Sequence, residues 1–263
     1  PNNHFLHHEL IKLPDGNYLG LIETTQLGPI PIGDWTPGFQ FAGYAADGVT
    51  NEFPWVGDKI VIWDKDTNNI IWEWNSFDHF SMEDFDDIIS WDQALGLGRY
   101  DWTHANALWP TFDEYNNLES IYISSRHLSR ITKIDYLSGQ IDWNLGLEMP
   151  SGDVDCGQDI LFSYQHSLMI TEGGNIVTLD NGNLSQQLRN TDYPETRALE
   201  VDFDSGEVLW EHALDQEYYG PASANAQKLN NGNYLIGTIG SGGTVFEVSS
   251  DNRTIWKADL NIS

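Results

Sequence analysis

Basic residues are scarce in this sequence. Its 263 residues include 12 Lys and Arg against 40 Asp and Glu, which gives a formal net charge of −28. A surface this acidic repels nucleic acid and anionic lipid, so neither is expected as a partner. An anionic substrate would need a local cluster of positive charge. The 8 histidines and the few arginines are therefore the residues to follow.

Cysteine is also scarce, and long apolar runs are absent. Cys156 is the single cysteine, so no disulfide can form within the chain, and we expect a buried or neutral thiol. No run approaches the roughly 18 apolar residues of a membrane span, so membrane insertion is not expected. No signal peptide opens the chain, and Pro1 is not a natural first residue. We expect a processed or truncated N-terminus.

What the sequence does contain is an internal repeat. Residues 8–19 match residues 166–177, and in both segments the glycine of a Gly-Asn pair follows a histidine by eight positions. Residues 223–235 keep the pattern without the histidine, and their opening SANA resembles HANA at 104–107. Each repeat then continues with alternating apolar residues around a polar turn, which indicates a hairpin. A tryptophan near the end of each repeat is expected to pack between neighbouring sheets: Trp72, Trp143, Trp210 and Trp256.

Two hairpins per repeat predict a four-stranded blade and an all-β fold, the β-propeller. We expect one domain over residues 1–263. Four repeats are at the low end for closing such a ring. Either two further blades precede Pro1 in a longer chain, which we favour because the chain opens directly at a motif, or degenerate strands in the insertions complete the ring. The predicted blades cover about residues 8–76, 102–146, 164–214 and 222–260.

Two segments interrupt the repeats. Residues 28–55 are rich in Gly, Pro and aromatics and are predicted to form a long loop, and residues 81–95 form the one plausible helical or irregular insertion. The insertion is acidic and could hold calcium, but a solvated loop is the expected structure. Its acidic residues are Glu83, Asp84, Asp86, Asp87 and Asp92.

Three histidines occupy related places in the repeats. His8, His104 and His166 each fall near the start of a blade's first strand, a position that faces the central channel of a propeller. Arg126 follows the second strand of its blade and can turn toward the same rim. An arginine fork suits an oxyanion, and a neutral histidine can act as a nucleophile or as an acid and base. This set favours transfer of a sulfuryl or phosphoryl group.

Other interpretations stay open at this point. Taken singly, a histidine on a strand is more often a packing residue than a functional one. Three histidines can also bind zinc with a water, and the one short histidine spacing is His4, His7 and His8. A cationic Arg126 nearby argues against a metal. The remaining histidines are expected to be structural or peripheral, and they are His4, His7, His79, His127 and His212. His7 is the least certain of these because it neighbours His8.

Several segments together resemble a known family, the bacterial arylsulfotransferases that do not use 3′-phosphoadenylyl sulfate. The resemblance runs in order through nearly the whole chain, which makes it more specific than any single motif. It implies a six-bladed propeller that moves a sulfuryl group between phenols through a sulfohistidine. The matching segments are HHELIKLPDGNYL, DWTHANALWP, IYISSRHLSRITKID, SGQIDWNLG, QHSLMITEGGNIVTLDNG, ETRALEVDF and SANAQKLNNGNYLIG.

The same resemblance implies roles for individual residues. His166 looks like the nucleophile, and His104 and Arg126 look like groups that hold the sulfuryl oxygens and aid proton transfer. His8 looks like a further oxygen-binding or acid/base group, although Glu9 stands where the family usually has Asp. Substrate-binding roles are expected for Trp102, Asn106, Tyr164 and His7.

The sequence therefore predicts an arylsulfotransferase-like enzyme with small aryl sulfate and phenol substrates and no cofactor. Its expected location is periplasmic or extracellular, and a homo-oligomer is left open. The alternative is a non-catalytic propeller that serves as a binding or structural assembly module of an extracellular acidic protein.

Overall fold

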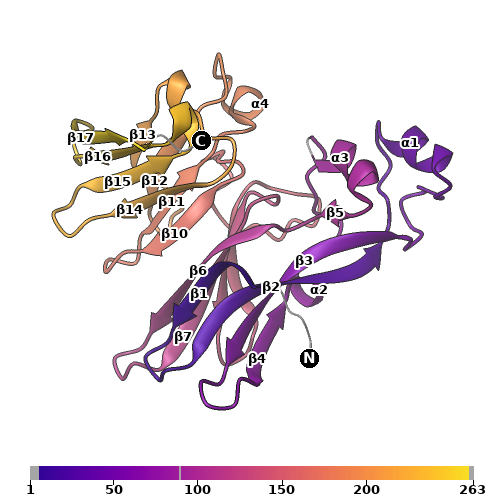
Figure 1. The fold of residues 1–263 in the computed structure, drawn as a ribbon, viewed down its shortest axis with the longest axis horizontal. Helices are drawn as coiled ribbons and strands as arrows, with labels where there is room; N and C mark the ends of the chain where they lie inside the picture. The colour runs from indigo at the N-terminus through magenta and orange to yellow at the C-terminus, as the bar shows by residue number, and fades with distance from the viewer. Residues whose placement is uncertain (1–5, 89, 261–263) are drawn as a thin grey trace. The chain divides into compact units, whose positions relative to one another are not determined.

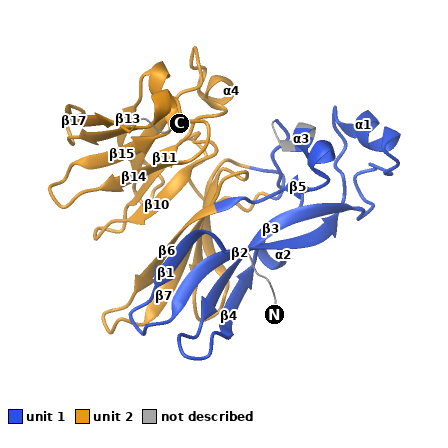
Figure 2. Cartoon of the chain, in the orientation of Figure 1, with its two compact units in different colours: residues 1–105, 149–151 blue, residues 106–148, 152–263 orange. Residues whose placement is uncertain are grey.

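The computed structural model describes residues 6–88 and 90–260. The chain forms two compact units, one of residues 1–105 and 149–151 and the other of residues 106–148 and 152–263 (Figure 2). Among the described residues, no helix has both the length and the apolar character needed to cross a membrane.

Unit 1 is built on one antiparallel sheet in the order β1-β2-β3-β4 (Figure 1). A tight turn around Gly16, at φ +92°, joins the first two strands, and the short β5 pairs in parallel with β3. The strands are β1 (Leu6–Lys12), β2 (Tyr18–Gly28), β3 (Phe53–Trp63), β4 (Ile70–Asn75) and β5 (Tyr100–Asp101), and the helices are α1 (Thr36–Phe41), α2 (Ser76–His79) and α3 (Ser90–Leu97).

The β2–β3 hairpin is longer than the sequence pattern predicts. The expected third strand begins at Ile60, whereas β3 begins at Phe53 and stays paired with β2 as far as Gly28. The predicted loop over 28–55 therefore shrinks to residues 29–52, which carry α1. Phe53 and Trp55 are fully buried, and this apolar alternation supports the extra strand length.

An aromatic cluster covers this long hairpin. Trp91 of α3 stacks on Tyr100 with ring centroids 4.1 Å apart and also contacts Trp55. Such pairs contribute about 0.5–1.5 kcal/mol beyond the burial of their area. The insertion over 81–95 is helical from Ser90, as the sequence allowed.

The expected solvation of the acidic insertion is wrong for two of its residues. Asp84 and Asp86 are buried, at 0% and 5% exposure. Asp84 accepts hydrogen bonds from the backbone and the hydroxyl of Ser151, at 2.9 and 2.6 Å. A buried carboxylate needs such donors, and they are distant in the sequence, so composition alone does not reveal them.

The described part of unit 2 forms three four-stranded antiparallel sheets, each a meander in chain order. With the sheet of unit 1 this gives four blade-type sheets, so the predicted fold class, an all-β fold of propeller blades, is confirmed. The first sheet comprises β6 (Ala105–Phe112), β7 (Leu118–Ser125), β8 (Arg130–Asp135) and β9 (Ile141–Gly146). The second comprises β10 (His166–Ile170), β11 (Ile176–Asp180), β12 (Arg197–Val201) and β13 (Val208–Ala213), and the third β14 (Ala224–Lys228), β15 (Tyr234–Thr238), β16 (Thr244–Val248) and β17 (Thr254–Asp259). Short helices lie between strands: α4 (Ser185–Arg189), η1 (Gln216–Tyr218) and η2 (Gly240–Gly242).

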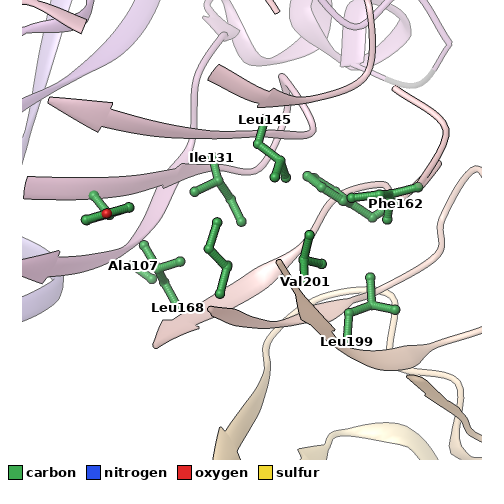
Figure 3. Packing of buried hydrophobic residues seen from close by; sticks show 10 residues of the cluster. Ala107, Ile131, Leu145, Phe162, Leu168, Leu199 and Val201 are labelled. Carbon is green, nitrogen blue, oxygen red and sulfur yellow. The ribbon is translucent and has the colours of Figure 1, made fainter. Parts of the chain in front are cut away.

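The core of unit 2 lies between its sheets. Ile131 and Leu145 from one sheet pack with Leu168, Leu199 and Val201 from the next (Figure 3). Fully burying each aliphatic side chain stabilises the fold by about 1.5–3 kcal/mol. A second cluster joins the β10–β13 and β14–β17 sheets.

The tryptophan plates agree only in part with the sequence prediction. Trp210 is 8% exposed and stacks on Tyr234 of the following sheet, with centroids 3.5 Å apart. Trp143 contacts Phe203 of the following sheet edge to face, with centroids 5.1 Å apart. Trp256 instead remains 49% exposed on β17, so the prediction that every repeat tryptophan packs between sheets is wrong there.

Candidate active site

His166 is the first residue of β10 and lies in an irregular backbone. Tyr164 and Ser167 on either side have φ of +57° and +61°, and the pairing of β10 with β11 shifts register directly after His166. These features turn the imidazole out of the regular alternation of the strand. The side chain is 7% exposed.

Hydrogen bonds of Gln165 hold this irregular segment in place. Its side-chain amide donates to the carbonyls of Ser125 and Arg130, at 3.2 and 3.0 Å. Its own carbonyl accepts a 2.7 Å hydrogen bond from the amide of Asn106. Asn106 therefore positions the backbone beside His166, and its Oδ1 is buried without a hydrogen-bond partner among the described residues.

The imidazole of His166 is held in one tautomer. Its Nδ1 lies 2.8 Å from Oδ1 of Asn181 and 3.2 Å from the carbonyl of Tyr164. Asn181 donates through Nδ2 to the carbonyl of Gly220 at 2.5 Å, so Oδ1 must face the imidazole. Two acceptors at Nδ1 require a hydrogen there, which leaves the lone pair on Nε2. That lone pair accepts from the backbone N–H of Ser223 at 3.3 Å.

A buried ion pair holds the turn that carries Asn181. Asp180 is fully buried, and it accepts from the guanidinium of Arg197 at 2.8 Å and from the backbone of Ser163 and Gly182. Gly182 has φ +70°, and a Cβ there would lie 1.8 Å from the carbonyl of Glu195. Only glycine fits this turn.

Arg126 is placed by contacts on three sides. Its guanidinium lies 2.6 Å from Nε2 of His127, donates to the carbonyl of Pro221 at 3.1 Å and sits 4.6 Å over the ring of Tyr164. The cation–π contact and the hydrogen bonds fix the plane of the fork. His127, expected to be peripheral, is thus a direct neighbour of the arginine.

Unit 1 gathers the other predicted histidines. His7 and His8 lie at a register shift of β1, where His8 has φ +55°, and their Nδ1 atoms are 2.9 Å apart. The rings of His8 and His104 are 5.5 Å apart, and Nδ1 of His104 lies 2.6 Å from Oδ2 of Asp101. His8 and His104 thus come together within one unit.

Asp58 lies next to this group and was not expected from the sequence. It is 3% exposed, with Oδ1 3.1 Å from Nε2 of His7. Its Oδ2 accepts from the hydroxyl of Thr103 and the backbone of Ala105, each at 2.6 Å, which fixes both neighbours of His104. No local spacing links residue 58 to residue 7, so the pattern carries no signal for this contact.

The predicted stacking residues are buried. Trp102 is fully buried and donates its indole N–H to the carbonyl of Asp84 at 2.7 Å. Tyr164 is 2% exposed and holds Arg126 on its ring. Both side chains support the fold of their own unit, and stacking on an aryl ring would need a face that is exposed.

The remaining predicted residues have the following places. His79 stacks on Trp74 and His212 on Trp210, as expected of packing histidines. His4 lies outside the described residues. The sequence-based expectation that His8, His104, His166 and Arg126 act at one cavity stays a prediction, since the first two belong to unit 1 and the last two to unit 2.

No curated protein matches the chain. Similar solved structures include a protein of unknown function from Bacteroides caccae (17% identity, TM-score 0.44, covering 77% of this chain and 54% of that one) and the Dos1 propeller (12%, 0.49, 97% and 48%). Another is BBS1N in complex with ARL6DN (9%, 0.44, 97% and 67%). The chain thus spans about half the length of the first two.

A family model gives a more specific result. The model described as Arylsulfotransferase (ASST) matches residues 46–261, which contain His104, Arg126 and His166 but not His7 or His8. The match covers most of the sequence and agrees with the resemblance found in its motifs. The chain belongs to the arylsulfotransferase (ASST) family.

Proposed function

We propose that this protein transfers a sulfuryl group from an aryl sulfate ester to a phenol, with Nε2 of His166 as the nucleophile. The observation that carries the proposal is the hydrogen-bonded tautomer of His166. With the hydrogen on Nδ1 and directed at Asn181, Nε2 presents a lone pair without a prior deprotonation.

The steps conserve atoms and charge. The Nε2 lone pair gives up its hydrogen bond from the backbone N–H of Ser223 and forms a bond to sulfur. The bond between sulfur and the phenolic oxygen breaks at the same time, and the phenolate leaves with the electron pair. The sulfated imidazole gains positive charge, which the hydrogen bond from Nδ1 to Asn181 helps to stabilise. A second phenol, losing its proton, then attacks sulfur and regenerates the neutral imidazole.

Arg126 supplies the oxyanion recognition in this proposal. A sulfuryl group spreads negative charge over its oxygens during transfer, and a fixed guanidinium stabilises that charge best when it does not have to reorganise. The contacts to Tyr164, His127 and Pro221 provide this rigidity in unit 2. Roles for His8 and His104 in the same reaction remain predictions.

The test is a transfer assay with an aryl sulfate donor and a phenol acceptor. His166→Ala is expected to lower transfer by about 10⁴-fold or more. His212→Ala is the matched control, because His212 stacks on Trp210 and is expected to leave the rate unchanged. Equal rates in His166→Ala and the unaltered protein would refute the proposal. Loss of turnover on chelation would favour a metal-dependent hydrolase instead.

A further inference from the structure

Five side chains form the contact between the last two sheets of unit 2. Trp210 of β13 stacks on Tyr234 of β15, with ring planes 6° apart. Glu200 of β12 lies 2.7 Å from Nζ of Lys228 and accepts from the hydroxyl of Tyr234. Asn175 donates to the same carboxylate at 2.7 Å. One sheet thus offers an Asn-Glu-Trp set, and the next sheet contacts it with a lysine and a tyrosine.

The β14–β17 sheet carries the same Asn-Glu-Trp set. Glu247 of β16 pairs with Trp256 of β17, and a register shift directly follows the pair. The β12–β13 ladder has the same shift after Glu200 and Trp210. Asn233 donates to Oε1 of Glu247 at 2.6 Å, so the asparagine of the set is present as well. We call Asn233, Glu247 and Trp256 the glutamate face.

The glutamate face lacks the lysine and the tyrosine in the described part of the chain. No cationic or phenolic side chain there contacts the carboxylate of Glu247, and both of its hydrogen bonds, from Asn231 and Asn233, reach Oε1. Oε2 is left open. Trp256 is 49% exposed, whereas its counterpart Trp210 is 8% exposed. The glutamate face therefore has the groups of the first contact without the side chains that complete it.

Unit 1 exposes the missing pair. Lys12 and Tyr18 form the last pair of the β1–β2 ladder. Lys228 and Tyr234 hold that place in the β14–β15 ladder, and both tyrosines stand in a Gly-Asn-Tyr-Leu segment. Lys12 is exposed, Tyr18 is 37% exposed, and Leu10 lies two residues before Lys12 on the same side of β1, at 54% exposure. We call Leu10, Lys12 and Tyr18 the lysine face.

The other described sheets do not repeat these sets. The position of the glutamate is occupied by Ile62 in the β3–β4 ladder and by Lys133 in the β8–β9 ladder. The position of the tyrosine is occupied by Leu118 at the start of β7 and by Ile176 at the start of β11. The glutamate face and the lysine face are therefore specific features of the last and the first sheet.

We propose that the glutamate face of one copy of this chain binds the lysine face of a second copy, with Trp256 stacked on Tyr18 and Lys12 paired with Glu247. Opposite charges then meet at the open carboxylate oxygen, and two exposed aromatic rings become buried. Because two different surfaces meet, the contact is heterologous, and it continues into a closed ring or an open chain of copies. The proposal does not depend on sulfuryl transfer.

Self-association of the 263-residue chain is the first test. The net charge of −28 makes the copies repel one another, so sedimentation velocity is measured at about 0.15 M salt, where charges are screened beyond about 8 Å. We expect dimers or larger assemblies at about 100 μM chain, a concentration that populates a weak contact. A chain that sediments as a monomer under these conditions would overturn the proposal.

Charge reversal tests which surfaces meet. Lys12→Glu and Glu247→Lys should each raise the Kd of self-association by about 10-fold or more, because like charges then face each other. An equimolar mixture of the two variants should associate again, since the unaltered lysine face of one meets the unaltered glutamate face of the other. A mixture that remains as dissociated as each variant alone would overturn the heterologous contact.

The aromatic stack has its own variant. Trp256→Ala should raise the Kd by about 10-fold or more, the usual effect of truncating an aromatic anchor. Arg99→Glu is the matched control for charge and should leave the Kd unchanged. Arg99 precedes β5, which pairs with β3 at Trp55, whereas Tyr18 pairs with the other end of β3. Unchanged association in Trp256→Ala, or equal weakening by Arg99→Glu and Lys12→Glu, would overturn the proposal.

Discussion

The side-chain oxygen of Asn181 lies 2.8 Å from Nδ1 of His166, and this contact determines which nitrogen of the imidazole bears the lone pair. His166 is the first residue of β10 and Asn181 directly follows β11, and the two strands pair with His166 opposite Leu179. A hydrogen bond that fixes a tautomer also fixes the direction of attack.

Asn181→Ala should lower kcat for sulfuryl transfer by about 10-fold, the equivalent of one lost hydrogen bond. KM should change little, because the substitution acts on the proposed nucleophile, His166. Transfer kinetics with a phenolic sulfate provide the measurement. Asn175→Ala is the matched control, since Asn175 donates to Glu200 at 2.7 Å in the same unit. A similar loss of kcat in both variants would show that Asn181 acts only through stability.

Arg126→Lys should lower kcat/KM by about 10²-fold, the typical effect of losing one oxyanion donor. Lysine keeps the charge but cannot form the planar fork that now contacts Pro221 and lies over Tyr164. Thermal unfolding of the variant separates this effect from damage to the fold. Full activity in Arg126→Lys would show that the guanidinium fork is not needed to stabilise the sulfuryl oxygens.

Asp180→Ala should destabilise unit 2 by about 3 kcal/mol or more, because it removes the buried acceptor of Arg197, Ser163 and Gly182 and leaves the guanidinium of Arg197 with the exposed Glu211 in place of a buried counter-charge. Urea unfolding measures this change. Asp204→Ala, on an exposed turn, should change the unfolding free energy little. Equal unfolding free energies for the two variants would contradict this account of the Asp180 turn.

Glu200 links stability to pH. Burial would raise the pKa of this carboxyl, but hydrogen bonds from Lys228, Tyr234 and Asn175 outweigh it and lower the pKa. A depressed folded-state pKa stabilises the protein above the ordinary glutamate value of about 4.3. That contribution is lost as pH falls through the folded value.

Glu200→Gln should therefore reduce the free energy of unfolding at pH 7. The difference from the unaltered protein should shrink as the pH falls through the folded-state value. Urea unfolding across this range measures the trend. A difference that stays constant with pH would show that the carboxylate charge contributes nothing.

The sequence patterns predict much of the fold. The Gly-Asn turns and the alternating strands identified four blades because each hairpin is a local pattern with a period of two. The sequence predicts too short a β3, because Phe53 and Trp55 lie at the end of a segment rich in Gly and Pro that is typical of a loop, although both side chains are buried. The exposure of Trp256 depends on what packs against β17, which no local pattern records.

The site was predictable only as a set of residues. Repeat position identified His8, His104 and His166, but it said nothing about their hydrogen-bond partners. Asp58 lies far from His7 in the sequence, and the register shifts that turn His8 and His166 depend on tertiary pairing. Partners of this kind follow from the folded backbone, so they escape a one-dimensional pattern.

We propose that His166 carries the sulfuryl group between donor and acceptor. Intact mass spectrometry after brief incubation with an aryl sulfate and no acceptor tests this role. We expect a gain of one SO₃ that maps to His166, disappears on addition of a phenol and is absent in His166→Ala. Phenol release without any adduct on His166 would contradict the covalent mechanism. The absence of both adduct and released phenol would indicate a non-catalytic binding module.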